Sequence, residues 1–324
     1  MNEIAITPTT NTPLARRFEE KLATPFIYKS VSNETRAAYK RGIKEFFAVV
    51  GGRHPAEVTP EHVINYRDGL QARGRKPATV CTKLSIVRSF FDYLLADGIV
   101  ARNPASTRFV TPPQLPTAPG GRSLTSKEVR YLLSGPDQKT TTGARDYAMI
   151  VVMVRLSLRE AEVASLRASG VKWNGTRWTL TCKIKGGREE VWPLPKDVKA
   201  AIDEYLELDK DRRSILKCDG SSKGSDAYVF QPVTNYATGI FDKALSTRSI
   251  QRIVGRWADF TGIGKVTPHD LRRTVVTRLL DLGYTYREVQ MVTKQKDPKT
   301  VMKYDYGREN LDKNPVNKLT YDDE

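Results

Sequence analysis

The chain has 324 residues and carries 53 Lys and Arg against 37 Asp and Glu, which gives a net charge of +16 at pH 7. With 39% hydrophobic and 28% charged residues, its composition excludes a fibrous or globally disordered chain and suits about two folded domains. Its apolar stretches are too short to span a membrane, and three separated cysteines and three histidines favour neither a disulfide framework nor a metal site. We therefore expect a cytoplasmic protein, nucleoid-associated if bacterial, whose partner is a polyanion such as nucleic acid.

The first third of the chain predicts a small helical domain behind a flexible arm. Residues 1–30 are rich in Pro, Thr and Asn and show little periodicity, which is typical of a loosely packed arm. Over residues 31–108, apolar side chains recur at intervals of three and four and predict three helices. Basic residues gather around the start of the third helix and give this domain a basic edge: Arg73, Arg75, Lys76, Lys83 and Arg88.

A proline-rich stretch over residues 109–122 predicts a linker to a second, larger domain over residues 123–309. A capping box at residues 125–128 predicts that a helix starts there, and apolar periodicity and capping signals predict further helices at 145–156, 196–208, 247–261, 269–282, 286–293 and from 298.

The one β region of this domain covers residues 171–194. Its turns at Asn174-Gly175 and at 185–188 predict a three-stranded antiparallel sheet. The expected fold class is therefore α+β, mainly helical with one small sheet, followed by a tail over residues 310–324.

Five side chains of the second domain are candidates for a functional site, although each alone has an ordinary structural explanation. His269 and Arg272 are three residues apart and would share one face of a helix, so an imidazole and a guanidinium could reach the same anion. Arg159 follows an apolar helix, Lys185 lies at a hairpin tip, and Tyr304 ends a short amphipathic helix. For each of them the alternative is a solvated or merely packed side chain.

The ordered set of motifs resembles the tyrosine recombinase (phage integrase) family. The segment SLREAEVASLR is similar to the family's first arginine box, and KIKGGREEVWPLP is similar to its hairpin lysine box. TPHDLRRTVVTRLL and KDPKTVMKYD resemble its second box and its tyrosine box, while KLSIVRSFFDYLLADGIVARNPA resembles part of its core-binding domain. One position departs from the family pattern, because Gln295 lies nine residues before Tyr304 where His or Trp is usual.

This resemblance implies a role for each candidate residue. Tyr304 would be the nucleophile, and Arg159 and Arg272 would stabilise the transition state. Lys185 would protonate the leaving 5′ oxygen, and His269 would act as base or phosphate donor.

Two further residues have supporting roles in this scheme. Glu162 is expected to orient a catalytic neighbour. Gln295 can donate a hydrogen bond to a phosphate oxygen but cannot carry charge.

The resemblance also implies the activity and the assembly. The protein would be a site-specific recombinase that cuts and rejoins duplex DNA through a covalent 3′-phosphotyrosine intermediate, with no cofactor. Its two domains would form a C-shaped clamp on a double-stranded recombination site, and its tail would dock on a neighbouring protomer. It would be a monomer or dimer when free and a homo-tetramer in the synaptic complex. DNA contacts are expected from the basic edge of the first domain and, in the second, from Arg248, Arg252 and Arg256.

Two alternatives remain open from the sequence. A type IB topoisomerase would use the same chemistry without pairing two sites. A catalytically weakened sequence-specific DNA-binding protein would keep the basic charge but lose cleavage. The sequence does not give the target site, the spacer length, the accessory proteins or the biological role among integration, excision, resolution and transposition.

Overall fold

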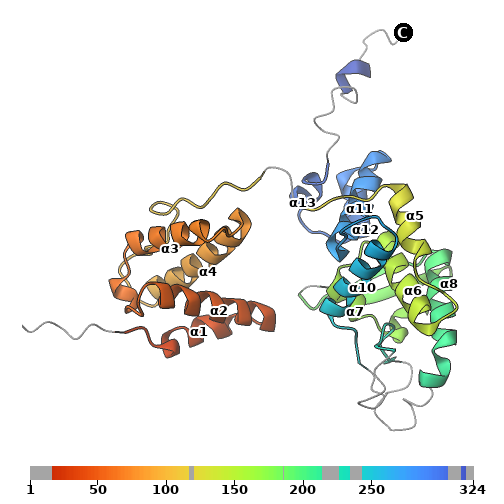
Figure 1. The fold of residues 1–324 in the computed structure, drawn as a ribbon, viewed down its shortest axis with the longest axis horizontal. Helices are drawn as coiled ribbons and strands as arrows, with labels where there is room; N and C mark the ends of the chain where they lie inside the picture. Colours follow the sequence, from red (N-terminus) through yellow and green to blue (C-terminus); the bar gives the residue numbers. More distant parts are fainter. Residues whose placement is uncertain are drawn as a thin grey trace, which may run out of the picture. The chain divides into compact units, whose positions relative to one another are not determined.

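The computed structural model describes residues 17–116, 120–184, 186–213, 226–233, 243–305 and 315–318. The chain divides into two compact units, residues 1–117 and 118–324, and Figure 1 shows their helices. The predicted fold class is confirmed, because the described residues are mostly helical with one three-stranded antiparallel sheet. Within these described ranges, no helix is long and apolar enough to cross a membrane, and no group of His, Cys, Asp or Glu could hold a metal ion.

The first unit is a set of helices around an aromatic core. Its elements are η1 (Glu20–Leu22), α1 (Thr24–Lys29), α2 (Asn33–Val49), η2 (Pro55–Glu57), α3 (Pro60–Ala72) and α4 (Pro77–Ala96). The Ser32 side chain caps α2 by accepting a hydrogen bond from the Thr35 backbone at 3.3 Å. Six rings form the centre of the core, and all are buried: Phe26, Phe46, Tyr66, Phe47, Phe90 and Phe91.

The expected flexible arm is wrong for residues 17–30, which pack on this core. The Phe18 ring stacks on Phe47 with 3.8 Å between centroids, and Phe26 in α1 is 1% exposed. A few aromatic residues among polar ones give no periodicity, yet each buries a large apolar area. The remaining arm residues, 1–16, lie outside the described residues.

The expected linker is also shorter than its proline content suggests. Val110 is fully buried in the first unit, and the carbonyl of Thr111 accepts a hydrogen bond from Arg67 Nη1 at 3.0 Å. Prolines fix an extended backbone but do not prevent it from packing, so this stretch follows the helices instead of leaving them.

The second unit surrounds α6 (Thr141–Leu156), which is apolar on nearly every side and packs against α8 (Lys196–Leu208) and α11 (Pro268–Asp281). Predicted and observed bounds agree closely for most helices, because most of them start at a recognisable cap, whereas α6 starts four residues before the predicted 145. The other helices are α5 (Ser126–Ser134), α7 (Glu160–Ala164), η3 (Ala168–Gly170), α10 (Thr247–Phe260), α12 (Tyr286–Thr293), α13 (Pro298–Met302) and η8 (Pro315–Lys318).

The sheet has the order β1 (Val171–Trp173), β2 (Trp178–Lys183) and β3 (Glu189–Pro193), with antiparallel neighbours. Leu180 on β2 is paired with Val171 and Trp192, and this face of the sheet joins the core. The Trp192 indole N–H donates to the carbonyl of Val292 at 2.7 Å, which ties the sheet to the last turn of α12.

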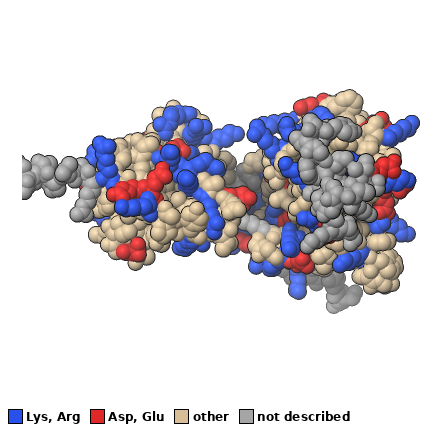
Figure 2. Space-filling model, turned by 90° about the horizontal axis from the view of Figure 1, so that it is seen from below, with Lys and Arg blue, Asp and Glu red and all other residues tan. Residues whose placement is uncertain are grey.

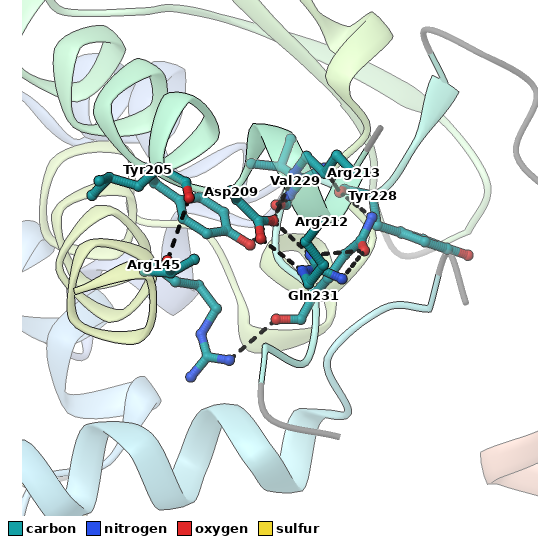
Figure 3. A network of polar contacts seen from close by, with 10 residues as sticks. Arg145, Tyr205, Asp209, Arg212, Arg213, Tyr228, Val229 and Gln231 are labelled. Carbon is teal, nitrogen blue, oxygen red and sulfur yellow. Dashed lines mark hydrogen bonds and ion pairs between the residues drawn. The ribbon is translucent and has the colours of Figure 1, made fainter. Parts of the chain in front are cut away.

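A buried carboxylate fastens the end of α8 to residues 228–231 (Figure 3). Asp209 is 1% exposed and accepts hydrogen bonds from Arg212 and Arg213, with distances of 2.5 to 2.8 Å. Arg213 also donates to the carbonyl of Tyr228 at 3.0 Å, and Arg212 donates to the Gln231 side chain at 3.2 Å. A buried charge is stable only when paired in this way, so the network fixes this side of the unit.

Candidate active site

Arg159 enters the site from the start of α7, where Glu162 holds it in two ways. The Glu162 carboxylate accepts a hydrogen bond from the Arg159 backbone N–H at 2.8 Å and from Nη1 of the same residue at 2.7 Å. Glu162 is buried, whereas 39% of the Arg159 side chain is exposed. The guanidinium is therefore bound to Glu162 through Nη1, and its remaining N–H groups can bind a ligand. This geometry agrees with the expectation that Glu162 orients a catalytic neighbour.

Arg272 lies on α11 and is 3% exposed. Its guanidinium donates to the carbonyl of Ser157, at the end of α6, and to the carbonyl of Thr293, at the end of α12, the latter at 2.7 Å. Carbonyl groups at helix C-termini carry partial negative charge, which favours a cation there. Burial and the nearby Arg159 charge nevertheless lower the pKa of Arg272 to about 10, so it stays protonated at neutral pH.

Both helix ends that contact Arg272 have an unusual backbone. Within the described ranges, the two non-glycine residues with positive φ are Ser157, at 56°, and Lys294, at 53°. Each terminates its helix in the left-handed region, which L residues adopt at some cost in energy. The resulting turns place the carbonyls of Ser157 and Thr293 on the same guanidinium, so backbone strain is concentrated at this site.

The nucleophile candidate lies against the histidine. The Tyr304 hydroxyl oxygen and His269 Nε2 are 3.2 Å apart, although the two residues are 35 positions apart in sequence. Tyr304 is 8% exposed, and its ring packs in a small cluster with Val276, Val289 and Val301. Because the ring is enclosed and the hydroxyl contacts the imidazole, the Tyr304 side chain is held in one orientation, with its hydroxyl toward His269.

His269 lies at the outer edge of the site, near the start of α11. Partial burial of the ring, followed by the charges of Arg273 and Arg272, lowers its pKa below the ordinary value. Asp270 acts in the opposite direction, and Arg159 lowers the pKa further. The imidazole is therefore neutral at pH 7, and one of its nitrogens is able to accept a proton.

These residues border a cleft of about 490 Å³. Arg159, His269 and Arg272 line one part of it, and Gln251 of α10 lines another. Gln251 Nε2 donates to the carboxylate of Glu160 at 3.0 Å, which satisfies the acidic group in this wall. Two guanidiniums and an imidazole facing one cleft form a site for an anionic, phosphate-sized group.

The remaining two candidates are placed differently. Lys185 lies outside the described residues. Gln295 follows the left-handed turn after α12 and is half-buried, and its side-chain oxygen is 3.4 Å from the Thr293 hydroxyl. It thus lies two residues from the carbonyl that Arg272 binds.

The predicted DNA contacts of the first unit divide into two groups. Arg73, Arg75 and Lys76 are exposed around the loop before α4. Lys83 instead pairs with Glu45, and Arg88 Nε donates to the carbonyl of Ala105 at 2.9 Å. The last two side chains are engaged within the protein.

The same division occurs on α10. Arg248 and Arg252 are exposed, close to the cleft residue Gln251. Arg256 forms an ion pair of 2.6 Å with Asp146, which is 0% exposed. Figure 2 shows Lys and Arg over both units on the face in view, with Asp and Glu among them.

Sequence reasoning missed Arg273, a buried neighbour of Tyr304. Its guanidinium carbon is 5.3 Å from the centroid of the Tyr304 ring. The one available signal was a second arginine directly after Arg272, which a single sequence cannot distinguish from a surface charge.

The site, with two guanidiniums and an imidazole at one cleft and a tyrosine hydroxyl against the imidazole, indicates an enzyme that acts on phosphate esters. The profile of the phage integrase family matches residues 122–309, and that of the phage integrase N-terminal SAM-like domain matches residues 14–99. The chain belongs to the phage integrase family and is a tyrosine-type site-specific DNA recombinase.

Curated relatives and solved structures agree with this assignment. The chain is 31% identical to tyrosine recombinase XerD of Xanthomonas axonopodis pv. citri over 220 residues, and this match covers 67% of each of the two chains. It is 28% identical to tyrosine recombinase XerC of Thermodesulfovibrio yellowstonii over 265 residues, and this match covers 82% of each of the two chains. A lambda integrase dimer bound to a core site has a similar fold, with a TM-score of 0.65 and 15% identity over 90% of this chain and 97% of that one.

Proposed function

We propose that Tyr304 is the nucleophile of this recombinase and that Arg159, Arg272 and His269 form its active site. The observation that carries the proposal is the distance of 3.2 Å between the Tyr304 hydroxyl and His269 Nε2, at a cleft lined by both arginines. A nucleophile in reach of a base, beside donors for the developing charge, is the arrangement that phosphoryl transfer requires.

The reaction is a pair of transesterifications. Tyr304 Oη forms a bond to the phosphorus while the bond from phosphorus to the 5′ oxygen breaks, which leaves a 3′-phosphotyrosine. The hydroxyl proton passes to neutral His269, and Lys185 gives a proton to the leaving oxygen. Strand exchange and rejoining reverse these steps on a new 5′ hydroxyl, so the phosphodiester energy is kept and no cofactor is needed.

The two arginines stabilise the transition state by different means. Arg159 is held by Glu162 but partly exposed, so its guanidinium can adjust its position as the phosphate changes geometry during the reaction. Arg272 is buried and fixed by two carbonyls, so it offers a preorganised donor. Burial and, after it, repulsion by Arg159 lower the pKa of Arg272, and an anion that binds between the two cations relieves the repulsion.

The assembly and the domain roles are part of this proposal. The core-binding domain extends from residue 17 to about residue 111, and the catalytic domain extends from residue 120 to residue 309. The two domains close as a C-shaped clamp on a duplex recombination site. The protein works in the cytoplasm, as a monomer or dimer when free and as a homo-tetramer in synapsis, with the tail 310–324 docking on a neighbour. A lambda integrase tetramer bound to a Holliday junction, with a TM-score of 0.64, supports this arrangement.

A nicked suicide substrate, from which the cleaved fragment diffuses away, tests the function. A covalent protein–DNA band and joint products from two sites are the expected results. Relaxation of supercoiled DNA without joint products would indicate a type IB topoisomerase. Specific binding with no covalent band would indicate a DNA-binding protein without cleavage activity.

The role of Lys185 is tested by changing the leaving group. We expect Lys185→Ala to slow single-turnover cleavage by about 10²- to 10⁴-fold, the usual contribution of a general acid. A substrate with sulfur at the 5′ bridging position should restore the rate, because a thiolate leaves without protonation. Lys183→Ala, an exposed lysine of the same hairpin, is the control and should cleave normally. If sulfur fails to restore the Lys185→Ala rate, another group is the acid.

Gln295 is expected to donate one hydrogen bond to a non-bridging oxygen. Such a bond to a charged acceptor contributes roughly 1–3 kcal/mol, so Gln295→Ala should slow cleavage by about tenfold to a hundredfold. The acid limb of the pH profile should lie below the ordinary histidine pKa, since His269 titrates there, and should be unchanged in Gln295→Ala. Gln295→His should be tolerated and should add a limb near neutrality.

Single-turnover cleavage measured from about pH 5 to 9 gives both the rate and the profile. Lys299→Ala, an exposed lysine of α13, serves as the control. A Gln295→Ala enzyme that matches the parent at every pH would mean that this amide does not contact the phosphate. Lys294 and Lys296 would then be the candidates for that contact.

A further inference from the structure

A short segment of the second unit lies along the helix that carries His269 and Arg272. We call residues 120–124 the strap, since they follow the end of the first unit and precede α5. The strap contacts successive turns of α11 through four hydrogen-bonded pairs: Gly120–Arg273, Arg122–Asp270, Ser123–Thr277 and Leu124–Thr274. The last three have distances of 3.0, 2.9 and 2.8 Å.

The strap fits α11 so closely that one position accepts only glycine. Gly121 has φ +103°, a conformation that other residues rarely adopt. A Cβ atom at this position would lie 2.6 Å from Asp270 Oδ1 and 3.1 Å from Arg273 Nη1. Gly120 differs, because a Cβ atom there would meet nothing within 4 Å.

Arg273 contacts the strap with one part of its guanidinium and faces the nucleophile with another. Its Nη2 donates to the carbonyl of Gly120, and its guanidinium carbon is 5.3 Å from the centroid of the Tyr304 ring. The side chain is 2% exposed, so its position is set by packing. A guanidinium at this distance from a ring attracts it and restricts its movement.

We propose that Arg273 is a positioning residue that couples the strap to the nucleophile. It acts by fixing the ring that carries the hydroxyl, since its guanidinium lies over that ring. Because Arg273 binds the strap and also lies over the Tyr304 ring, a displacement of the strap on α11 reaches Tyr304 through this side chain. The reactive geometry of Tyr304 would thus depend on how the strap is held on α11.

This coupling rests on the proposed role of Tyr304 as nucleophile, but it has a readout that needs no activity. Amide hydrogen exchange of residues 298–305, measured on the full chain without DNA, reports how firmly the tyrosine segment is held. Tyr304→Phe removes the nucleophile, keeps the ring and separates the two proposals. A Tyr304→Phe protein that still forms the adduct would refute the function, while the exchange data would still decide the coupling.

The first arm of the test changes Arg273. Arg273→Met keeps much of the side-chain volume but removes the charge and the hydrogen bond, and we expect faster exchange over 298–305. Single-turnover cleavage should fall by about tenfold to a hundredfold, because a displacement near 1 Å can cost that much, while DNA affinity should hold. Arg273→Lys should recover part of the rate, since an ammonium can still bind the carbonyl and face the ring. Arg278→Met changes an exposed arginine of the same helix and should leave both readouts at the parent level.

The second arm changes the strap and leaves Arg273 in place. Gly121→Ala should displace the strap, increase exchange over 298–305 and slow cleavage, whereas Gly120→Ala should do neither. If Gly121→Ala leaves the tyrosine segment and the cleavage rate unchanged, there is no coupling. Parent-like cleavage and exchange in Arg273→Met would also overturn the proposal. If Arg273→Met does not fold, Arg273→Lys and the two glycine variants decide the question.

Discussion

Tyr304→Phe is expected to abolish the covalent protein–DNA complex and to leave DNA binding within about twofold of the parent, a change of less than 1 kcal/mol. The hydroxyl is the attacking group, whereas the ring supplies the packing with Val276, Val289 and Val301. Removing one oxygen therefore stops the chemistry without emptying the cluster. Trapping on a nicked suicide substrate measures the amount of covalent complex, and a binding titration measures the DNA affinity.

The control for this prediction is the neighbouring tyrosine. Tyr306 lies outside the described residues and is two positions further along the chain. Tyr306→Phe should form the covalent complex normally. If Tyr304→Phe forms the complex and Tyr306→Phe does not, Tyr306 is the nucleophile and the hydrogen bond between His269 and Tyr304 has another purpose.

Arg272→Ala is expected to reduce single-turnover cleavage about a thousandfold or more. Loss of one preorganised donor to a developing oxyanion typically costs about 10²–10³ in rate, and this guanidinium can offer two. The substitution also leaves the carbonyls of Ser157 and Thr293 without this donor, at a cost of about 1–3 kcal/mol for each buried group. Both the rate and the free energy of unfolding should fall.

A conservative variant separates the two effects of Arg272. Arg272→Lys keeps the charge but has one nitrogen in place of the planar fork that reaches two carbonyls through Nη1 and Nη2, so it should regain stability more than rate. Arg155→Ala, an exposed arginine that pairs with Asp197, is the matched control and should alter neither quantity much. A cleavage rate in Arg272→Ala within tenfold of the parent, measured on folded protein, would remove this residue from the catalytic set.

Much of the fold could be read from the sequence, because its signals are local. Thr125 and Glu128 do form the capping box of α5, and Asn174-Gly175 does join two antiparallel strands. The site residues Arg159, His269 and Tyr304 were indicated by their order along the chain. Arg159 and His269 line one cleft and Tyr304 contacts His269 because of the way α6, α11 and α13 pack, which no local pattern contains.

The features that the sequence did not reveal depend on distant partners. Phe18 and Val110 read as parts of an arm and a linker, because the core that buries them is formed elsewhere in the chain. Arg273 reads as one more basic residue until Gly120 and Tyr304 are placed beside it.

The ion pairs of Lys83 and Arg256 reduce the number of basic side chains that are available to bind DNA phosphates. On binding DNA, a basic side chain releases condensed counterions only if it neutralises a phosphate. Lys83 would first have to leave Glu45, and Arg256 would have to leave the buried Asp146. The electrostatic part of DNA affinity, and its sensitivity to ionic strength, is therefore carried by exposed residues such as Arg75 and Arg252 and is smaller than the number of Lys and Arg residues, 53, suggests.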